Sequence, residues 1–435
     1  YYFGGEDDGA MTTGWLQIDI TYDEAINDDY KYTAAAFNDD EDQTRWFYFK
    51  SNGKMIKSDE GDRTKDKTIN GKKYAFDQYG AMVAEWSLDS DDEKEASDNV
   101  GHYAASTNQT VASVSEAWQG KGNYAQYSKA WKYFNSVEDG ARVSKGWFKV
   151  VPAEYLNEGK YDDDEDFWYY ADGSGNLYAG EFKTIKGKKY AFRNDGRMLT
   201  GLKFILEDDD NDNLTVYADD DGTYNFDNED DFLDNAVAFY EPGGYKCYYF
   251  GGGDDGAMRT NKTTVEIDGE NHNFYFEKSG SKKGAGVTGE KDDKLYQSGM
   301  LLKADSDDKY VVVDKTTKYT TNAAGEKVLD YVTYNKLDDA KDFMAQDDVL
   351  ESNTAVDADG KIDLGNNNKK KAEDISEAYT IRYKAYGSSD MTTHEYFLVN
   401  TSGKVIDNRG KNKDGSDYYY VTDNSGKITN IYVED

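Results

Sequence analysis

A β-hairpin is encoded in TINGKKYAFDQYGAM, residues Thr68–Met82. Tyr74 and Phe76 are two positions apart, so both side chains project to the same face of a strand. Gly80 ends the polar stretch that follows, and glycine tolerates the positive φ of a hairpin turn. Met82 then returns on the second strand. The segment therefore predicts a short antiparallel hairpin with one aromatic face.

The same motif recurs along the chain. Thr68–Phe76 has a near copy at Thr184–Phe192, with eight of nine positions identical. YYFGGEDDGAM at Tyr1–Met11 recurs at Tyr248–Met258 with ten of eleven positions identical. Looser copies, with two alternating aromatic residues before a glycine-containing turn, occur at Trp46–Met55, Trp131–Val143, Trp168–Gly180, Tyr190–Met198, Asn273–Ser281, Tyr396–Val405 and Tyr418–Ile428. Repetition of one unit in this way predicts stacked supersecondary structure.

A single hairpin is at best marginally stable in water, so the aromatic face of each must be covered by the next. The sequence therefore predicts an all-β fold, a β-hairpin solenoid of stacked aromatic repeats with irregular insertions. One short helix is expected at residues 335–351, because Leu337, Ala340, Phe343 and Met344 follow helical spacing.

Changes in composition divide the chain. β-Hairpin repeats are predicted for residues 1–86, 131–205, 241–330 and 386–435. Between them we expect a polar insertion at 87–130, an acidic insertion at 206–240 and a non-repeat region at 331–385 that holds the helix. Insertions of this kind are expected as loops, which a solenoid tolerates on one face.

Composition also limits the function. The 435 residues include 51 Lys and Arg against 86 Asp and Glu, which gives a net charge of −35. This acidity argues against nucleic acid and anionic membrane as partners, and no apolar run is long enough for membrane insertion. With 38 Tyr, 19 Phe and 7 Trp but only 2 Pro, the chain is unlike a disordered one. Cys247 is the single cysteine, so no intrachain disulfide is expected.

The repeats resemble a known family. Gly14-Trp15 with WFYFKSNGKM at Trp46–Met55, together with Thr68–Met82, is similar to cell-wall-binding repeats. These include the choline-binding repeats of pneumococcal surface proteins, the glucan-binding repeats of streptococcal glucosyltransferases and the C-terminal repeats of clostridial toxins. The resemblance implies a noncatalytic, extracellular, cell-surface module of a Gram-positive bacterium. It also implies a partner in choline-bearing teichoic acid, glucan or another extracellular glycan.

The resemblance also implies binding residues. A choline cage takes aromatic side chains from consecutive hairpins, which hold the quaternary ammonium by cation–π attraction. The matching positions are Trp15, Trp46 and Tyr48 in one place, and Trp147, Trp168 and Tyr170 in another. The long acidic insertion between Trp15 and Trp46 departs from the regular spacing of the family. Two alternatives stay open: these rings pack the solenoid core, or they stack on sugar rings.

Catalytic and metal-binding patterns are weak. His102, His272 and His394 lie far apart and match no catalytic motif, so neither enzyme activity nor a cofactor is predicted. DADGKID at Asp357–Asp363 resembles part of a calcium loop, but Ala355 and Asn366 would occupy its first and last ligand positions, so no metal site is predicted there. Loose binding of calcium by the acidic clusters is left open.

A structural role is the alternative function. Stacked hairpins would also suit a rigid extracellular stalk or a subunit of a self-assembling filament, because an uncapped hairpin at the end of a solenoid invites self-association. Tyr1 falls inside a repeat motif, which suggests either a fragment of a longer solenoid or a processed subunit whose first strand completes a neighbour. Surface binding of choline or glycan remains the leading hypothesis.

Overall fold

The computed structural model describes residues 1–4, 7–20, 43–59, 62, 64–77, 79–88, 124–153, 156–208, 213–216, 226–337, 349–384, 389–407 and 410–435. The chain divides into two compact units, which are considered separately below. The first unit comprises Tyr1–Gly201, Glu207–Thr223 and Phe250–Met258. The second comprises Leu202–Leu206, Tyr224–Tyr249 and Arg259–Asp435.

Strands predominate in the described residues, and three α-helices accompany them. Up to residue 249 the elements are β1 (Gly14–Ile20), β2 (Gln43–Phe49), β3 (Thr64–Ile69), β4 (Lys72–Asp77), β5 (Glu85–Leu88), α3 (Tyr124–Lys129), β6 (Trp131–Phe134), β7 (Gly146–Val150), α4 (Glu158–Asp162), β8 (Phe167–Ala171), β9 (Glu181–Ile185), β10 (Lys188–Phe192), β11 (Leu202–Asp208), β12 (Asn213–Val216), α5 (Glu229–Gly243) and β13 (Lys246–Tyr249). Beyond it follow β14 (Asn261–Ile267), β15 (Glu270–Phe276), β16 (Gly289–Lys291), β17 (Lys294–Gln297), β18 (Met300–Leu301), β19 (Tyr310–Thr321), β20 (Lys327–Leu337), β21 (Leu350–Ser352), β22 (Lys361–Asp363), β23 (Lys369–Lys371), β24 (Ile375–Ile381), β25 (Thr392–Asn400), β26 (Asn412–Lys413), β27 (Tyr418–Thr422) and β28 (Ile428–Glu434).

The first unit is a succession of two-stranded antiparallel hairpins: β1–β2, β3–β4, β5–β6, β7–β8 and β9–β10. After the hairpins β3–β4, β5–β6 and β9–β10, and in the segment Phe250–Met258, the main chain bonds back to an earlier hairpin. Four main-chain hydrogen bonds of this kind among the described residues, all 2.8 Å long, run from Met82 N to Trp46 O, Arg142 N to Lys73 O, Met198 N to Trp168 O and Met258 N to Lys189 O. These bonds join successive hairpins, in agreement with the predicted stacking of hairpin repeats, which is confirmed.

The turns explain where part of the acidic charge is used. Asp172 donates its main-chain N–H to the Asn176 carbonyl (2.8 Å), and its carboxylate accepts the N–H groups of Ser174 (2.7 Å) and Asn176 (2.9 Å). Gly175 completes the turn with φ +89°, a conformation that glycine adopts without strain. The same side-chain bonds recur in turns that open at Asp77, Asn322, Asp357, Asn400 and Asp423. An Asp or Asn at the first turn position thus satisfies main-chain donors that no strand can pair.

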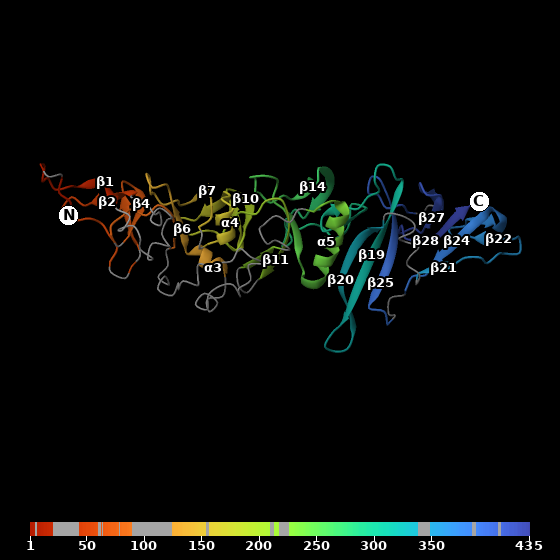
Figure 1. The fold of residues 1–435 in the computed structure, drawn as a ribbon. Helices are drawn as coiled ribbons and strands as arrows, with labels where there is room; N and C mark the ends of the chain where they lie inside the picture. The colour runs from red at the N-terminus through yellow and green to blue at the C-terminus, as the bar shows by residue number, and fades with distance from the viewer. Residues whose placement is uncertain are drawn as a thin grey trace. The chain divides into compact units, whose positions relative to one another are not determined.

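The second unit is organised as wider sheets. Their strand orders are β14-β15-β18-β17-β16, β20-β19-β25 and β21-β24-β28-β27-β26, beside the pair β22–β23. The long strands β19, β20 and β25 stand out in Figure 1. Val312 on β19 faces Leu398 on β25 and Leu337 on β20, so these sheets join segments that are far apart in the sequence. The terminal repeats of residues 386–435 are therefore shared between two sheets.

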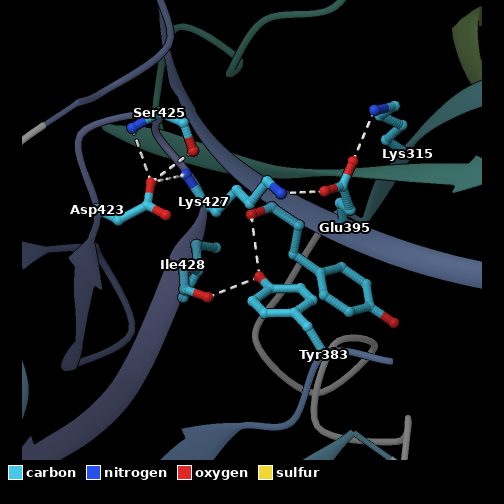
Figure 2. Close-up of polar contacts among 8 residues, drawn as sticks. Lys315, Tyr383, Glu395, Asp423, Ser425, Lys427 and Ile428 are labelled. Carbon is cyan, nitrogen blue, oxygen red and sulfur yellow. Dashed lines mark hydrogen bonds and ion pairs between the residues drawn. The ribbon is translucent and has the colours of Figure 1, made fainter. Parts of the chain in front are cut away.

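Polar contacts support the C-terminal turn of this unit (Figure 2). Asp423 accepts hydrogen bonds from the main chain of Ser425 and Lys427. The Lys427 ammonium pairs with Glu395, whose other oxygen lies 2.6 Å from the Lys315 Nζ atom. Although burial raises the pKa of Glu395, its hydrogen bonds and charge interactions with these two lysines hold that pKa below its usual value.

Tyr383 closes the same cluster (Figure 2). Its hydroxyl donates a 2.6 Å hydrogen bond to the Ile428 carbonyl, and burial raises the pKa of this hydroxyl. The side chains of Lys315, Glu395, Lys427 and Tyr383 therefore link β19, β25 and the start of β28.

The helices differ from prediction. The predicted helix at 335–351 is wrong at both ends, because residues 335–337 belong to β20 and residues 350–351 to β21, while residues 338–348 lie outside the described part. In β20 the main chain pairs with β19 up to Leu337, and this ladder overrides the helical spacing. No helix in the described ranges is long and apolar enough to cross a membrane.

The longest described helix lies where an acidic loop was expected. α5 begins after Asn228, whose side chain accepts the Asp231 N–H (2.8 Å), and acidic residues fill its first turn, where they favour the helix dipole. Phe232, Ala236 and Phe239 form its buried face. Acidic composition at 206–240 therefore concealed an amphipathic helix whose apolar residues pack into the second unit.

Candidate aromatic ligand-binding corners

Three hairpins of the first unit carry the same arrangement of aromatic rings. In each, a tryptophan on the first strand faces a tyrosine on the second strand, and a second tryptophan precedes that tyrosine by two residues. Alternation along a strand places all three rings on one face. We name these groups the first corner (Trp15, Trp46, Tyr48), the second corner (Trp86, Trp131, Tyr133) and the third corner (Trp147, Trp168, Tyr170).

The rings have nearly the same geometry in the three corners. The two indoles are close to perpendicular, with ring centroids 6.2 Å apart at 90° in the first corner, 6.4 Å at 84° in the second and 6.4 Å at 88° in the third. The tyrosine ring centroid lies 5.1, 5.1 and 5.0 Å from the first tryptophan, respectively. Edge-to-face packing of this kind is favourable, and it sets the planes of the two indoles at right angles to each other.

The next hairpin covers one side of each corner. In the first corner Tyr74 and Phe76 lie 4.9 and 5.9 Å from Trp15, and in the third Tyr190 and Phe192 lie 4.9 and 5.8 Å from Trp147, measured between ring centroids. Met82 and Met198 belong to the same two clusters. These third-corner residues follow their first-corner counterparts by 116 positions, so the duplicated sequence builds a duplicated site.

The rings of the three corners differ in solvent exposure. All rings of the first and third corners are half-buried. In the second corner Trp86 is 7% and Trp131 1% exposed, because Leu88, Ala153 and Leu156 join Phe148 and Tyr169 in the buried cluster around them. The Trp86 indole also donates a 2.7 Å hydrogen bond to the Val151 carbonyl. Burial also raises the pKa of Tyr133 to about 12. The second corner is therefore part of the core, while the other two present ring surface to solvent.

A carboxylate lies beside each half-buried corner. In the first, Glu138 Oε2 accepts hydrogen bonds from the Trp46 indole (3.1 Å) and from Gln17 Nε2 (3.4 Å). In the third, Asp254 instead pairs with the Lys149 ammonium, at 3.2 Å from Oδ1. Glu138 and Asp254 are again 116 positions apart, each two residues before a turn glycine.

The six residues that the family resemblance implied are thus brought together in two groups of three, and their role in binding stays a prediction. Each group lies on a single hairpin, β1–β2 or β7–β8, and not on two consecutive hairpins as the resemblance implied. Sequence reasoning missed the second corner, where Glu85 stands in place of the glycine before the tryptophan. It also missed Glu138 and Asp254. The signal that could have found these two carboxylates is the offset of 116 positions, which they share with Tyr74 and Tyr190.

No protein-family model matches the chain, and no curated protein matches it by sequence. The chain is structurally similar to pneumococcal choline-binding proteins. Choline binding protein F from Streptococcus pneumoniae is 17% identical, with 99% of this chain and 89% of that chain covered and a TM-score of 0.37. The modular autolysin LytC of the same species is 18% identical, with 61% and 38% covered and a TM-score of 0.24. The endolysin of phage Cp-1, solved with choline, is 18% identical, with 40% and 35% covered and a TM-score of 0.17.

The second unit contains a separate pocket of about 380 Å³. Tyr245, Tyr331 and Lys282 are among its lining residues, together with Glu277, which forms a 3.2 Å ion pair with Lys291. None of the residues implied by the family resemblance lies in it. The pocket is therefore distinct from the aromatic corners.

The histidines occupy structural positions where the structure describes them. Nδ1 of His394 lies 2.9 Å from the Asp314 carboxylate and 3.2 Å from the Thr316 hydroxyl. Both partners meet the same ring nitrogen, so the group is not a relay in which histidine bridges an acid and a nucleophile. His272 is buried, and His102 lies outside the described residues.

The acidic segments form no metal site in the part of the chain that the structure describes. Among the described residues no three His, Cys, Asp or Glu side chains are grouped to hold a metal ion. Asp357 uses its carboxylate to accept the N–H groups of Asp359 and Lys361, both at 3.0 Å. The calcium-loop likeness at 357–363 is thus explained by a hairpin turn.

Proposed function

We propose that the chain is a noncatalytic module of the bacterial cell surface that binds a wall polymer through quaternary ammonium groups such as choline. The first and third corners are the binding sites. The observation that carries this proposal is the pair of half-buried, perpendicular tryptophans, repeated in both corners with a carboxylate beside each. The buried second corner is the contrast, because there the same rings serve the core.

The physical basis is cation–π attraction. A cation within about 6 Å of the centroid of a tryptophan or tyrosine ring gains roughly 0.5–1 kcal/mol at an exposed site and about 2 kcal/mol when desolvated. Each corner offers three such rings on one face of a hairpin. The methyl groups of a quaternary ammonium also bury apolar surface, which a small hydrated cation does not. Site multiplicity along a polymer adds avidity.

The charge of the chain supports the same class of ligand. A net charge of −35 concentrates cations near the surface and repels anionic polymers. Glu138 places one negative charge directly at the first corner. A neutral sugar would stack on the same rings and donate hydroxyl hydrogen bonds to the Glu138 carboxylate, but it would gain no charge attraction, so a choline-bearing polymer is preferred over glucan.

Retention on immobilised choline tests the proposal. We expect the full chain to be retained and to be eluted by free choline. The double variant Trp46→Leu/Trp168→Leu removes one indole from the first corner and one from the third, and it should pass through the choline matrix without being retained. Tyr161→Leu removes an exposed aromatic ring of the same unit outside the corners, so this control variant should be retained.

Near-ultraviolet circular dichroism of each variant establishes that the unit is folded. Passage of the folded wild-type chain through the choline matrix would contradict the proposal. Binding to purified cell walls from which choline has been removed, without binding to choline itself, would instead assign the corners to a glycan.

A further inference from the structure

One strand position distinguishes the three corners. It is the residue directly across from the second tryptophan, and it is Gln17 in the first corner, Leu88 in the second and Lys149 in the third. We propose that this residue sets the cation preference of each corner, so that the first corner is the high-affinity site and Lys149 weakens the third. The inference rests on the proposed binding of organic cations by these corners.

The second corner shows that the residue at this position affects how far the tryptophan rings are exposed to solvent. Leu88 is completely buried in the same cluster as Trp86 and Trp131. An apolar residue here extends the core over the tryptophans. A polar residue at the same position stays exposed, as Gln17 and Lys149 do, and leaves the ring faces accessible.

In the first corner the amide of Gln17 keeps a negative charge in place. Gln17 is neutral, and both it and the Trp46 indole donate to the Glu138 carboxylate. Two neutral donors orient the carboxylate without cancelling its charge. A cation that approaches the indole faces therefore meets three aromatic rings and a carboxylate that forms no ion pair within the described residues.

In the third corner the protein supplies its own cation. Lys149 is exposed, and its ammonium lies 3.2 Å from one oxygen of Asp254 and 3.3 Å from the other. The carboxylate charge is thereby compensated. The Trp168 indole N–H, which corresponds to the one that Glu138 accepts in the first corner, has no hydrogen-bond partner within the described ranges. An incoming quaternary ammonium must approach a positive charge on the same strand face.

Exchange of the two residues tests this inference. Single-corner proteins are made first: Trp168→Leu leaves the first corner, and Trp46→Leu leaves the third. Choline is then titrated into each by isothermal calorimetry. Gln17→Lys in the first-corner protein should weaken choline binding about 5- to 10-fold, and Lys149→Gln in the third-corner protein should strengthen it by a similar factor.

A neutral probe separates charge from shape. 3,3-Dimethylbutan-1-ol replaces the ammonium of choline by carbon, so its affinity should change less than about twofold in either exchange, because no cation–charge term is involved. Both exchanged residues are exposed, and their replacement should leave the fold intact.

The outcomes separate the inference from the proposed function. If neither single-corner protein binds choline, both fail. If choline binds and the exchanges change its affinity by less than twofold, only the inference fails. Equal shifts for choline and for the neutral probe would also overturn it, because the effect would then be steric.

Discussion

Asp77 opens the turn that connects Phe76 to Met82, two residues that support the first corner. Its carboxylate is 2% exposed and accepts main-chain N–H bonds from Tyr79 (2.8 Å) and Ala81 (2.9 Å). Its second oxygen has no hydrogen-bond partner in the described structure. Burial raises the pKa of this carboxyl to about 6, even though the main-chain donors and Arg45 act to lower it.

The sign and size of the effect follow from this pKa. Because the pKa in the folded state lies above the unfolded value of about 3.9, the folded state binds the proton more tightly, and its contribution to stability is lost as the pH rises through about 6. The whole effect is about 3 kcal/mol, of which about 2 kcal/mol falls between pH 4.5 and pH 7.5. Asp77→Asn removes the titration, so the variant should gain about 2 kcal/mol relative to the wild type over this pH range.

Urea unfolding followed by tryptophan fluorescence measures this difference. All seven tryptophans lie between residues 15 and 168, so the signal reports on the first unit. Other carboxyls titrate alike in both proteins and cancel in the difference. Asp172→Asn, the same replacement at a half-buried position in a turn of the same type, is the control and should follow the wild type within about 0.5 kcal/mol. Parallel curves for wild type and Asp77→Asn from pH 4.5 to 7.5 would refute the reasoning.

Three further changes have defined outcomes. Gly256→Ala should destabilise the first unit by about 2 kcal/mol in urea unfolding, because φ is +62° and the new Cβ would lie 2.2 Å from Met198 Sδ. Gly187→Ala is the control: φ is +82° but no atom lies within 4 Å of the new Cβ, so the free energy of unfolding should fall by only about 1 kcal/mol. Glu138→Gln should weaken choline binding about threefold by calorimetry, and the difference should shrink in 1 M salt. Tyr383→Phe should destabilise the second unit by about 1 kcal/mol, seen as faster hydrogen exchange in β28 with unchanged tryptophan fluorescence; equal exchange rates would contradict a stabilising role for this hydroxyl.

Several parts of the structure could be predicted from local pattern. Tyr74, Phe76 and Gly80 specify a hairpin within a few residues, because strand alternation and a positive φ are short-range properties. The hairpin fold was confirmed for this reason. The helix prediction at 335–351 was wrong at its ends because the pairing of β20 with β19 is a long-range interaction that outweighs local spacing.

The residues of the candidate site could be predicted from local sequence only in part. Family resemblance selected Trp15 and Trp46, which the structure places in one corner with Tyr48. Glu138 follows Trp46 by 92 residues, and only the stacking of successive hairpins brings its carboxylate to the indole. α5 was hidden for a related reason, because its acidic residues dominate the composition while its buried face is defined by partners elsewhere in the second unit.

Taken alone, the sequence determined the repeating hairpin, the positions of its turns and the alternation that aligns three aromatic rings on one strand face. These are consequences of backbone geometry over short distances. Only the tertiary structure decided which rings remain accessible. The second corner is closed and the first and third are half-open because of what neighbouring hairpins place on them, and burial depends on packing between segments that the local pattern does not contain.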